Sequence, residues 1–248
     1  GLDVAKTIRR RVFTFGELLK LEKRKKVTSA AVEKARTWLR EGAADHGWYD
    51  YTFEEWGKAL ASVGFDNAEI NFTGFWCQGD GACFTASVDL RVLIPFLADP
   101  PEAQQRIDCD AQGNEIWLPW VVFKVKGVSG NPEFARLLAI VDHLDMGVER
   151  IWGGGNYSHE GMCRVMGELL SDGWTTTGGQ RHRKFLWARR PTLDGVWDDF
   201  VKAAERLRYD LCKAIYKDLE AEHEHLTSDE SLADASDSEL VAIAGKAV

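Results

Sequence analysis

No uninterrupted apolar run in this chain approaches ~18 residues, so a membrane-spanning helix is not expected. The first thirty residues are basic and contain no apolar segment of the kind that secretory signals need, so we expect a cytoplasmic protein. Cations are also in the minority, because 31 Lys and Arg face 39 Asp and Glu, for a net charge of −8. This balance argues against a protein that coats nucleic acid with its whole surface.

The five cysteines do not follow the spacing of a metal or redox site. Cys77 and Cys83 are the closest pair, and five residues separate them, whereas zinc ribbons and thioredoxin-like motifs use two. An odd count in a chain of this length also argues against a disulfide framework. Gly153–Gly155 lacks the spacing and the lysine of a phosphate-binding loop. We therefore expect free thiols in a reducing cytoplasm, and neither a metal nor a cofactor.

Charge is distributed unevenly between the two ends. Residues 1–26 contain nine basic and three acidic residues, whereas residues 218–248 contain nine acidic residues and one basic residue. Such asymmetry is typical of interaction arms, and it also fits two solvated helix faces that touch each other, which we favour. We define a basic N-terminal segment, 1–27, and an acidic helical C-terminal segment, 218–248, within a single α+β domain, 1–248.

A second basic cluster alternates with aromatic residues. It consists of Arg181, Arg183, Lys184, Arg189 and Arg190, with Phe185 and Trp187 between them. Basic residues interleaved with aromatics can hold single-stranded nucleic acid. Alternation also fits a strand that turns Phe185 and Trp187 inward and the charges outward, and we favour this strand over 181–187.

Two helices are predicted in the N-terminal quarter. The first covers about Ser29 to Ala44, with one apolar stripe formed by Ala31, Ala35, Trp38 and Gly42. The second covers Phe53 to Val63. Thr52 and Glu55 have the spacing of a capping box at its start, and Gly64 is a plausible stop.

A β-hairpin is predicted next. Ile70–Trp76 and Ala82–Leu90 have the composition of strands, and Asp80-Gly81 between apolar runs favours a two-residue turn. That turn would place Cys77 opposite Phe84, which argues against a Cys77–Cys83 disulfide.

The middle of the chain contains further strands and one helix. Residues 115–126 are typical of a strand that Pro119 restricts to a sheet edge. Asn131-Pro132 then starts a helix that ends at Gly147. Its apolar face is predicted to be Phe134, Leu137, Leu138, Val141 and Leu144. Strands are expected at 150–152 and 157–166, and Gly178-Gly179 joins a further hairpin.

The C-terminal third is predicted to be helical. Apolar residues recur with 4-3 spacing over three heptads, at Leu193, Trp197, Phe200, Ala204, Leu207, Leu211 and Ala214. This stripe fits a homodimer seam along 193–214 or a long helix that covers the sheet, and we favour the latter. Thr227 with Glu230 resembles a second capping box. The expected fold is therefore α+β, with an antiparallel sheet of hairpins packed against N-terminal helices and a long C-terminal helix.

Two clusters contain residues suited to acid–base chemistry. One is Asp142, His143 and Asp145 on the predicted helix, and the other is Tyr157, His159 and Glu160 near the glycine-rich turn. A histidine beside carboxylates can act as a general acid or base. No established catalytic signature is present, so hydrogen-bonded surface residues explain both clusters as well, and turn chemistry explains Asp80.

Aromatic residues are abundant, with ten Trp in the chain. They gather at 48–56 and again at Phe75 and Trp76. Most should belong to the core, and a surface share would supply the anchors of a binding interface.

Residues 70–84 resemble a hairpin motif, roughly Phe-Ser-Gly-Phe-Trp-Ser-Gln-Gly-Asp-Gly-Ala, of an uncharacterised family of tailed-bacteriophage and prophage proteins. Looser similarity extends to 33–36, 48–50, 157–160 and 219–230. Members of this family are often labelled antitoxins of toxin–antitoxin stability systems. The resemblance implies a phage or prophage protein in the bacterial cytoplasm and identifies no catalytic residue. Cys77 stands where the motif has Ser, which argues against a hydroxyl role there.

Two hypotheses follow from these observations. In the first, a phage accessory protein binds and inhibits or diverts a host protein or ribonucleoprotein complex, such as a CRISPR–Cas defence complex or a toxin, without catalysis. Nucleic acid could also bind through the basic clusters. Its candidate binding residues are Trp76, Gln78, Asp80, Tyr157, Arg181, Arg183, Lys184, Asp229 and Glu230.

In the second hypothesis, the protein is a small enzyme that acts on a nucleotide or nucleic acid. Asp80, His159 and Glu160 would be its catalytic residues, and the basic cluster at 181–190 would hold phosphate. This arrangement requires the three polar groups to converge in one cleft.

Overall fold

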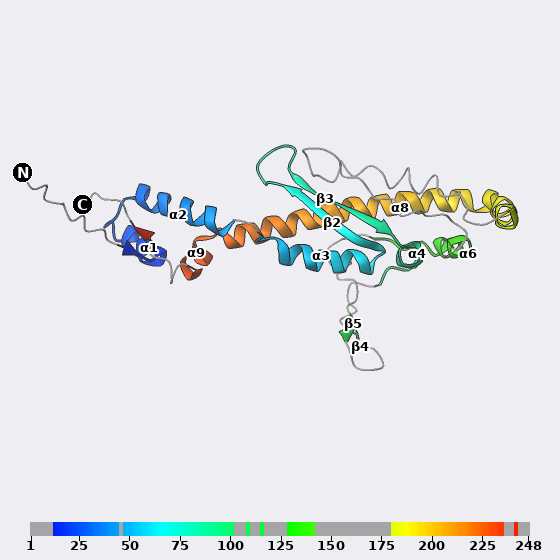
Figure 1. Ribbon diagram of the computed structural model, residues 1–248, viewed down its shortest axis with the longest axis horizontal. Coiled ribbons are helices and arrows are strands. Elements are labelled where there is room, and N and C mark those ends of the chain that lie inside the picture. Colours follow the sequence, from blue (N-terminus) through cyan, green and yellow to red (C-terminus); the bar gives the residue numbers. More distant parts are fainter. Residues whose placement is uncertain are drawn as a thin grey trace, which may run out of the picture. The chain divides into compact units, whose positions relative to one another are not determined.

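The computed structural model of the chain describes residues 12–44, 47–101, 108–109, 115–116, 128–141, 180–235 and 241–242 (Figure 1). These residues form helices, two-stranded antiparallel sheets and one long C-terminal helix. The predicted α+β fold class is therefore confirmed.

The chain divides into two compact units. Unit 1 contains residues 1–50 and 219–248, and unit 2 contains residues 51–218. The sequence was interpreted as one domain with a basic segment at 1–27 and an acidic segment at 218–248. In the structure the basic segment and all but the first residue of the acidic segment belong to the same unit.

Unit 1 combines both ends of the chain. Strand β1 (Val12–Phe13) pairs antiparallel with β6 (Val241–Ala242), and helices α1 (Phe15–Lys23), α2 (Ser29–Ala43) and α9 (Asp229–Ala235) pack together. Their common core consists of Phe15, Leu18, Val32, Ala35, Leu39 and Leu232. Helix α1 starts with a capping box that was not predicted from the sequence: the Thr14 side chain accepts from the Glu17 amide, and the Glu17 side chain accepts from the Thr14 amide.

Helix α2 confirms the predicted helix, but its predicted apolar stripe is confirmed only at Ala35 and is wrong at Trp38. The buried positions are Val32, Ala35 and Leu39, whereas Trp38 is 54% exposed. Residues three and four apart share a helix face, so burial of Leu39 turns Trp38 about 100° away from the core. The aliphatic side chains of Val32 and Leu39 pack in the core in place of the predicted aromatic side chain.

The predicted capping box at Thr227 and Glu230 is also wrong. Helix α9 begins at Asp229, and its cap is Ser228, whose hydroxyl accepts from the Ser231 amide at 3.2 Å. The Thr227 hydroxyl instead donates to the His223 carbonyl at 2.7 Å, within the last turn of the preceding helix.

Unit 2 contains the predicted hairpin. Strands β2 (Phe65–Thr73) and β3 (Gly81–Val88) pair antiparallel, with a register shift between Asp66 and Glu69. Asn67 within this shift has a positive φ of 51°, which identifies a β-bulge. Strand β2 begins five residues and ends three residues before its predicted bounds, because sequence composition does not locate the bulge or the loop. Strand β3 differs from its predicted bounds by one residue at its start and two at its end.

Helix α3 (Asp50–Ser62) precedes the hairpin. It begins three residues before the predicted start, so Thr52 lies inside the helix and the predicted Thr52–Glu55 capping box is wrong. The predicted stop is confirmed, because Gly64 has a φ of +98°. A Cβ there would lie 2.8 Å from the Asp89 carbonyl oxygen and from the Leu93 amide nitrogen, so only glycine fits.

Helix α4 (Leu90–Ala98) follows β3 and was not predicted. Six of its nine residues are buried, so the segment lacks the polar face from which a surface helix is recognised. The two-residue strands β4 (Asp108–Cys109) and β5 (Glu115–Ile116) pair antiparallel. Most of the predicted strand at 115–126 lies outside the described residues.

Asn131 caps the next helical segment and Pro132 occupies its first position, as predicted. The segment is a 3₁₀ helix, η1 (Pro132–Leu137), followed by the short helix α6 (Leu138–Val141). Phe134, Leu137 and Ile140 are buried. Leu138 is 39% exposed, so the predicted apolar face is correct in Phe134 and Leu137 and wrong in Leu138.

Helix α8 (Gln180–Leu226) is 47 residues long, which corresponds to about 70 Å. All seven residues of the predicted 4-3 stripe are buried. Phe200 packs edge-on against Phe134 of η1 at 5.6 Å between ring centroids. The stripe is therefore covered within a single chain, and its side chains are not free to form a homodimer seam.

The strand predicted at 181–187 is wrong, because these residues form the first turns of α8. Arg, Lys, Leu and Trp in this segment all tolerate a helix. A short alternation of polar and apolar residues is weaker evidence than continuity with the long helical pattern that follows.

Candidate functional site

The most exposed large apolar side chain that the structure describes lies in the loop between β2 and β3. The register pairs Thr73 with Gly81, so the loop contains seven residues, 74–80. The predicted two-residue turn at Asp80-Gly81 is therefore wrong, and Phe84 pairs with Ile70 rather than with Cys77. Cys77 lies exposed in the loop while Cys83 is buried on β3, and both are free thiols.

A single carboxylate holds the loop backbone. Oδ2 of Asp80 accepts from the backbone amides of Trp76 and Cys77, each at 2.6 Å. The Asp80 amide donates back to the Cys77 carbonyl at 3.0 Å, which closes a turn. A carboxylate that accepts two amides fixes the conformation of the residues between them.

Gly74 allows the Asp80 carboxylate to approach the start of the loop. It has a positive φ of 29°, and a Cβ at this position would lie 3.1 Å from Oδ2 of Asp80. On the other side of the loop, the Thr73 hydroxyl donates to the Gly79 carbonyl at 3.4 Å. These contacts give the loop a defined shape before any partner binds.

Aromatic rings connect the loop to the rest of unit 2. Phe75 lies 5.9 Å from Phe72 of β2 and 5.5 Å from Tyr216 of α8, measured between ring centroids. Phe72 in turn packs edge-on against Phe53 of α3 at 6.1 Å. Phe75 therefore anchors the loop directly to β2 and α8, and through Phe72 to α3, which restricts the position of its neighbour Trp76.

Trp76 itself faces solvent. Its side chain is 80% exposed, and its indole contacts the edge of Phe75 at 6.0 Å. Cys77 and Gln78 beside it are exposed as well. The loop thus presents one large aromatic side chain and one amide on a backbone that Asp80 holds in place.

Six candidate residues either occupy a different position from the one the sequence suggested or lie outside the described residues. Arg181, Arg183 and Lys184 lie on the first turns of α8, where the structure describes the backbone alone. Tyr157, His159 and Glu160 lie outside the described residues, as do the 142–145 cluster and the predicted strands at 150–152 and 157–166. The convergence of Asp80 with His159 and Glu160 therefore stays a prediction.

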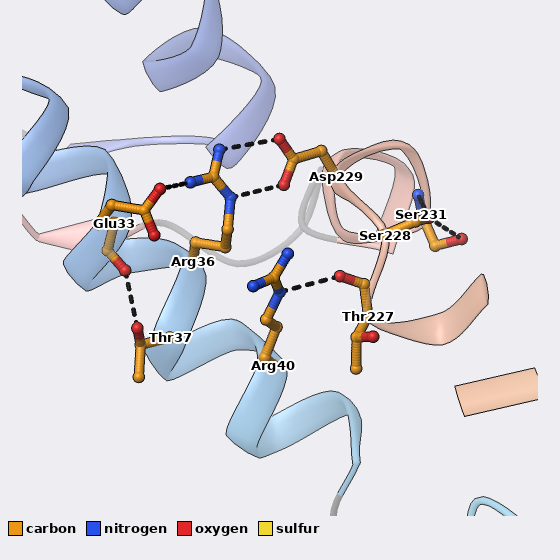
Figure 2. A network of polar contacts seen from close by, with 8 residues as sticks. All are labelled: Glu33, Arg36, Thr37, Arg40, Thr227, Ser228, Asp229 and Ser231. Carbon is orange, nitrogen blue, oxygen red and sulfur yellow. Dashed lines mark hydrogen bonds and ion pairs between the residues drawn. The ribbon is translucent and has the colours of Figure 1, made fainter. Parts of the chain in front are cut away.

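Asp229 and Glu230 belong to the first turn of α9 in unit 1. Figure 2 shows Asp229 beside Arg36. Asp229 forms a two-point ion pair with Arg36 of α2, with Nε to Oδ1 at 2.6 Å and Nη2 to Oδ2 at 2.8 Å. This pair lowers the pKa of the Asp229 carboxyl and raises that of the guanidinium. Arg36 also pairs with Glu33, and Arg40 donates from Nε to the Thr227 carbonyl at 3.0 Å.

The Arg36–Asp229 pair fastens α9 to α2, so Asp229 has an internal role, whereas Glu230 is exposed. Trp48 packs against His223 nearby in the same unit, with ring centroids 5.5 Å apart. Burial lowers the pKa of His223, so its imidazole is neutral at neutral pH.

Neither a metal cluster nor a membrane-spanning helix is found in the described part of the chain. No group of three or more His, Cys, Asp or Glu in that part is placed to hold a metal ion. None of its helices is both long enough and apolar enough to cross a membrane.

Residues 48–229 match the model of a domain of unknown function, DUF8835. Because the match covers most of the sequence, the chain belongs to this family. No curated protein and no solved structure matches the chain. The matched region contains the hairpin, its loop and α8, while the helices α1 and α2 precede it.

Proposed function

We propose that this member of a family of unknown function is a binding protein that acts without catalysis. In this proposal it is a phage-encoded accessory protein of the bacterial cytoplasm, and it inhibits or diverts a host protein or ribonucleoprotein complex. A defence complex such as CRISPR–Cas, or a toxin, is the class of target. The observation that supports it best is the 80% exposure of Trp76 on a loop held by Asp80.

An exposed tryptophan on a fixed loop has the properties of a binding anchor. Tryptophan is enriched among the residues that dominate interface energies. Because Asp80 and Phe75 already fix the backbone, less conformational entropy is lost when a partner covers Trp76. Gln78 beside it adds an amide that can donate and accept at the rim of such an interface.

The phage setting rests on the resemblance of residues 70–84 to the hairpin motif of tailed-phage proteins. The structure gives Gly74, Phe75 and Asp80 of that motif a role in shaping the loop. Trp76 is 80% exposed and Gln78 is exposed as well, so both are accessible to a partner. Binding accounts for residues of these types at those two positions.

The alternative of a nucleotide- or nucleic-acid-directed enzyme gains no support from Asp80. One oxygen of this carboxylate already accepts two short hydrogen bonds from the loop backbone. These bonds give the carboxylate a role in the shape of the loop, which accounts for its position. The binding proposal therefore explains Asp80 without an additional assumption.

Affinity purification from a bacterial host with intact defence systems tests the proposal. The tagged protein should retain a host protein or complex in stoichiometric amount. Trp76→Ala should lose that partner, whereas the matched control Tyr51→Ala, which removes a side chain that is 74% exposed in the same unit, should retain it. Recovery of the bare protein, repeated at low salt, or equal retention by both variants, would contradict the proposal.

A further inference from the structure

A second exposed surface lies in unit 1 at the end of α1 and differs in chemistry from the loop. Five cations lie within seven residues there, namely Lys20, Lys23, Arg24, Lys25 and Lys26, and all five are exposed. We call this surface the cationic turn. None of its five side chains forms an ion pair within the part of the chain that the structure describes.

The backbone of the cationic turn is a Schellman motif. The Lys25 amide donates to the Glu22 carbonyl at 2.8 Å, and the Lys26 amide donates to the Leu21 carbonyl at 2.9 Å. Lys25 occupies the position that needs a left-handed conformation, with a φ of +54°. Glycine is the usual residue at this position because a Cβ there is strained.

Helix stability explains only part of this charge. Lys20 and Lys23 lie in the last turn of α1, where a cation interacts favourably with the helix dipole. The same argument gives no reason for a lysine at position 25, where the side chain adds strain, nor for the uninterrupted run Lys23–Lys26. A side chain kept in a strained backbone conformation without a structural benefit, as at Lys25, indicates a functional role.

The cationic turn has no apolar anchor. The large apolar side chains described as exposed are Trp38, Tyr51, Trp76, Val92 and Leu138, and none belongs to residues 13–28. Protein interfaces depend on such anchors, whereas contact with a phosphate backbone needs only cations at intervals. The chemistry of the surface therefore fits a nucleic acid better than an acidic protein.

We propose that the cationic turn is a binding surface for the phosphate backbone of a nucleic acid, without preference for sequence. Glu22 is the one acidic residue between Lys20 and Lys26, so the local charge is positive in a chain whose net charge is −8. Long-range attraction is therefore weak, and binding depends on direct phosphate contacts that salt screens readily. This surface lies in unit 1 and is tested independently of the Trp76 loop.

The test is the salt dependence of binding to a fluorescein-labelled mixed-sequence DNA duplex, followed by fluorescence anisotropy with the full chain. Five phosphate contacts predict a slope of log K against log salt of about −4.5. Replacement of Lys20, Lys23, Lys25 and Lys26 by Gln should reduce that slope to about −1 and weaken binding at low salt.

The matched control replaces Lys34, Lys58, Lys202 and Lys217 by Gln. These lysines are also exposed, so the control loses the same charge from other surfaces and should keep the original slope. Equal losses in both variants would overturn the proposal, since only overall charge would then matter. Competition by polyglutamate as strong as that by unlabelled duplex would also overturn it, in favour of an acidic protein surface.

Lys25→Gly is the second variant. It removes one cation and relieves the left-handed strain, so it should raise the thermal midpoint by about 2 °C while it reduces the salt slope by about 0.9. An unchanged salt slope in this stabilised variant would show that Lys25 does not contact the nucleic acid. It would also contradict the functional reason proposed for a lysine at this strained position.

Discussion

The loop at 74–80 and the cationic turn both contain a residue in the left-handed region, but they use different residue types there. Each reverses the chain at the end of an element and contains a residue with positive φ. The loop uses Gly74 there and adds an internal carboxylate that holds two amides. The turn uses Lys25 and has no side-chain acceptor of its own, only the backbone bonds to Leu21 and Glu22.

The difference separates residues that shape the backbone from residues that the backbone presents. In the loop, Gly74, Phe75 and Asp80 determine the backbone conformation. Trp76 is left on the surface as an apolar anchor. In the turn, the left-handed position that glycine usually occupies is occupied by Lys25. An aromatic anchor fits a protein surface, whereas a run of cations fits phosphates, so the two regions should respond to different variants and to different salt concentrations.

The largest effect is expected from Trp76→Ala. Removal of a central aromatic anchor typically costs about 2–4 kcal/mol of binding free energy, so affinity for the captured partner should fall about 100-fold. Folding should be unaffected, because the side chain is 80% exposed. Biolayer interferometry measures the affinity, and urea unfolding provides the control. A partner that binds the variant as tightly as the native protein would place the interface elsewhere.

Asp80→Ala should have the next largest effect, and it acts on shape rather than on the anchor. The amides of Trp76 and Cys77 lose their acceptor, which costs about 1–2 kcal/mol of stability, and affinity for the partner should fall about tenfold because Trp76 is no longer held. Asp80→Asn keeps a side-chain oxygen that can accept and should lose less of both. If Asp80→Ala bound its partner as well as the native protein, preorganisation of the loop would have no part in binding.

Asp229→Asn tests the internal role of the acidic segment in unit 1. Because the Arg36 partner lowers the pKa of Asp229 in the folded state, the pair stabilises the fold above about pH 4 and ceases to do so as the pH falls through the lowered pKa. The variant should lose about 1 kcal/mol at neutral pH, after allowance for solvent exposure of the carboxylate, and progressively less as the pH falls through the lowered pKa of Asp229.

Glu33→Gln is the control for that variant. It removes the more exposed partner of Arg36 and should lower the free energy of unfolding by only about 0.3 kcal/mol. Chemical unfolding at several pH values measures both variants. An Asp229→Asn loss that persists unchanged at acidic pH would show that the ion pair is not its cause.

The last two substitutions change the residues at the two positive-φ positions, Gly74 and Lys25, and should shift stability in opposite directions. Gly74→Ala introduces a Cβ at a positive φ, 3.1 Å from Oδ2 of Asp80, and should cost about 1 kcal/mol. Lys25→Gly removes strain and should stabilise the protein by about 0.5 kcal/mol. Differential scanning calorimetry of the two variants should give shifts of opposite sign. Shifts of the same sign would contradict the assignment of Lys25 as strained.

Periodic patterns in the sequence predicted the long elements well. The 4-3 stripe from Leu193 to Ala214 and the hairpin around residues 70–90 are present, because burial on one face fixes both patterns. Helix α4 was not predicted because Leu93, Ile94 and Leu97 are buried alongside Leu90 and Phe96. The segment therefore has no polar face against which a helical apolar stripe can be recognised. The strand predicted at 181–187 failed because a local alternation competed with a longer helical continuation.

Details of the candidate site were harder to predict. The motif identified the loop, but the two-residue turn at Asp80-Gly81 was wrong, since the Asp80 carboxylate bonds to residues three and four positions earlier. Such a contact depends on the loop's three-dimensional shape rather than on dipeptide propensity. The Arg36–Asp229 pair joins residues 193 positions apart, and no local pattern connects them. The cationic run was visible as charge, but the strain at Lys25 was not.

Site-specific photo-crosslinking in the bacterial host tests the central claim most directly. A photoreactive phenylalanine analogue is placed at position 76, and in a matched strain at position 51, whose native tyrosine is comparably exposed. The account predicts a crosslink to one host protein from position 76 and none to that protein from position 51. No host adduct at position 76, or the same adduct at both positions, would contradict the assignment of the 74–80 loop as the binding surface.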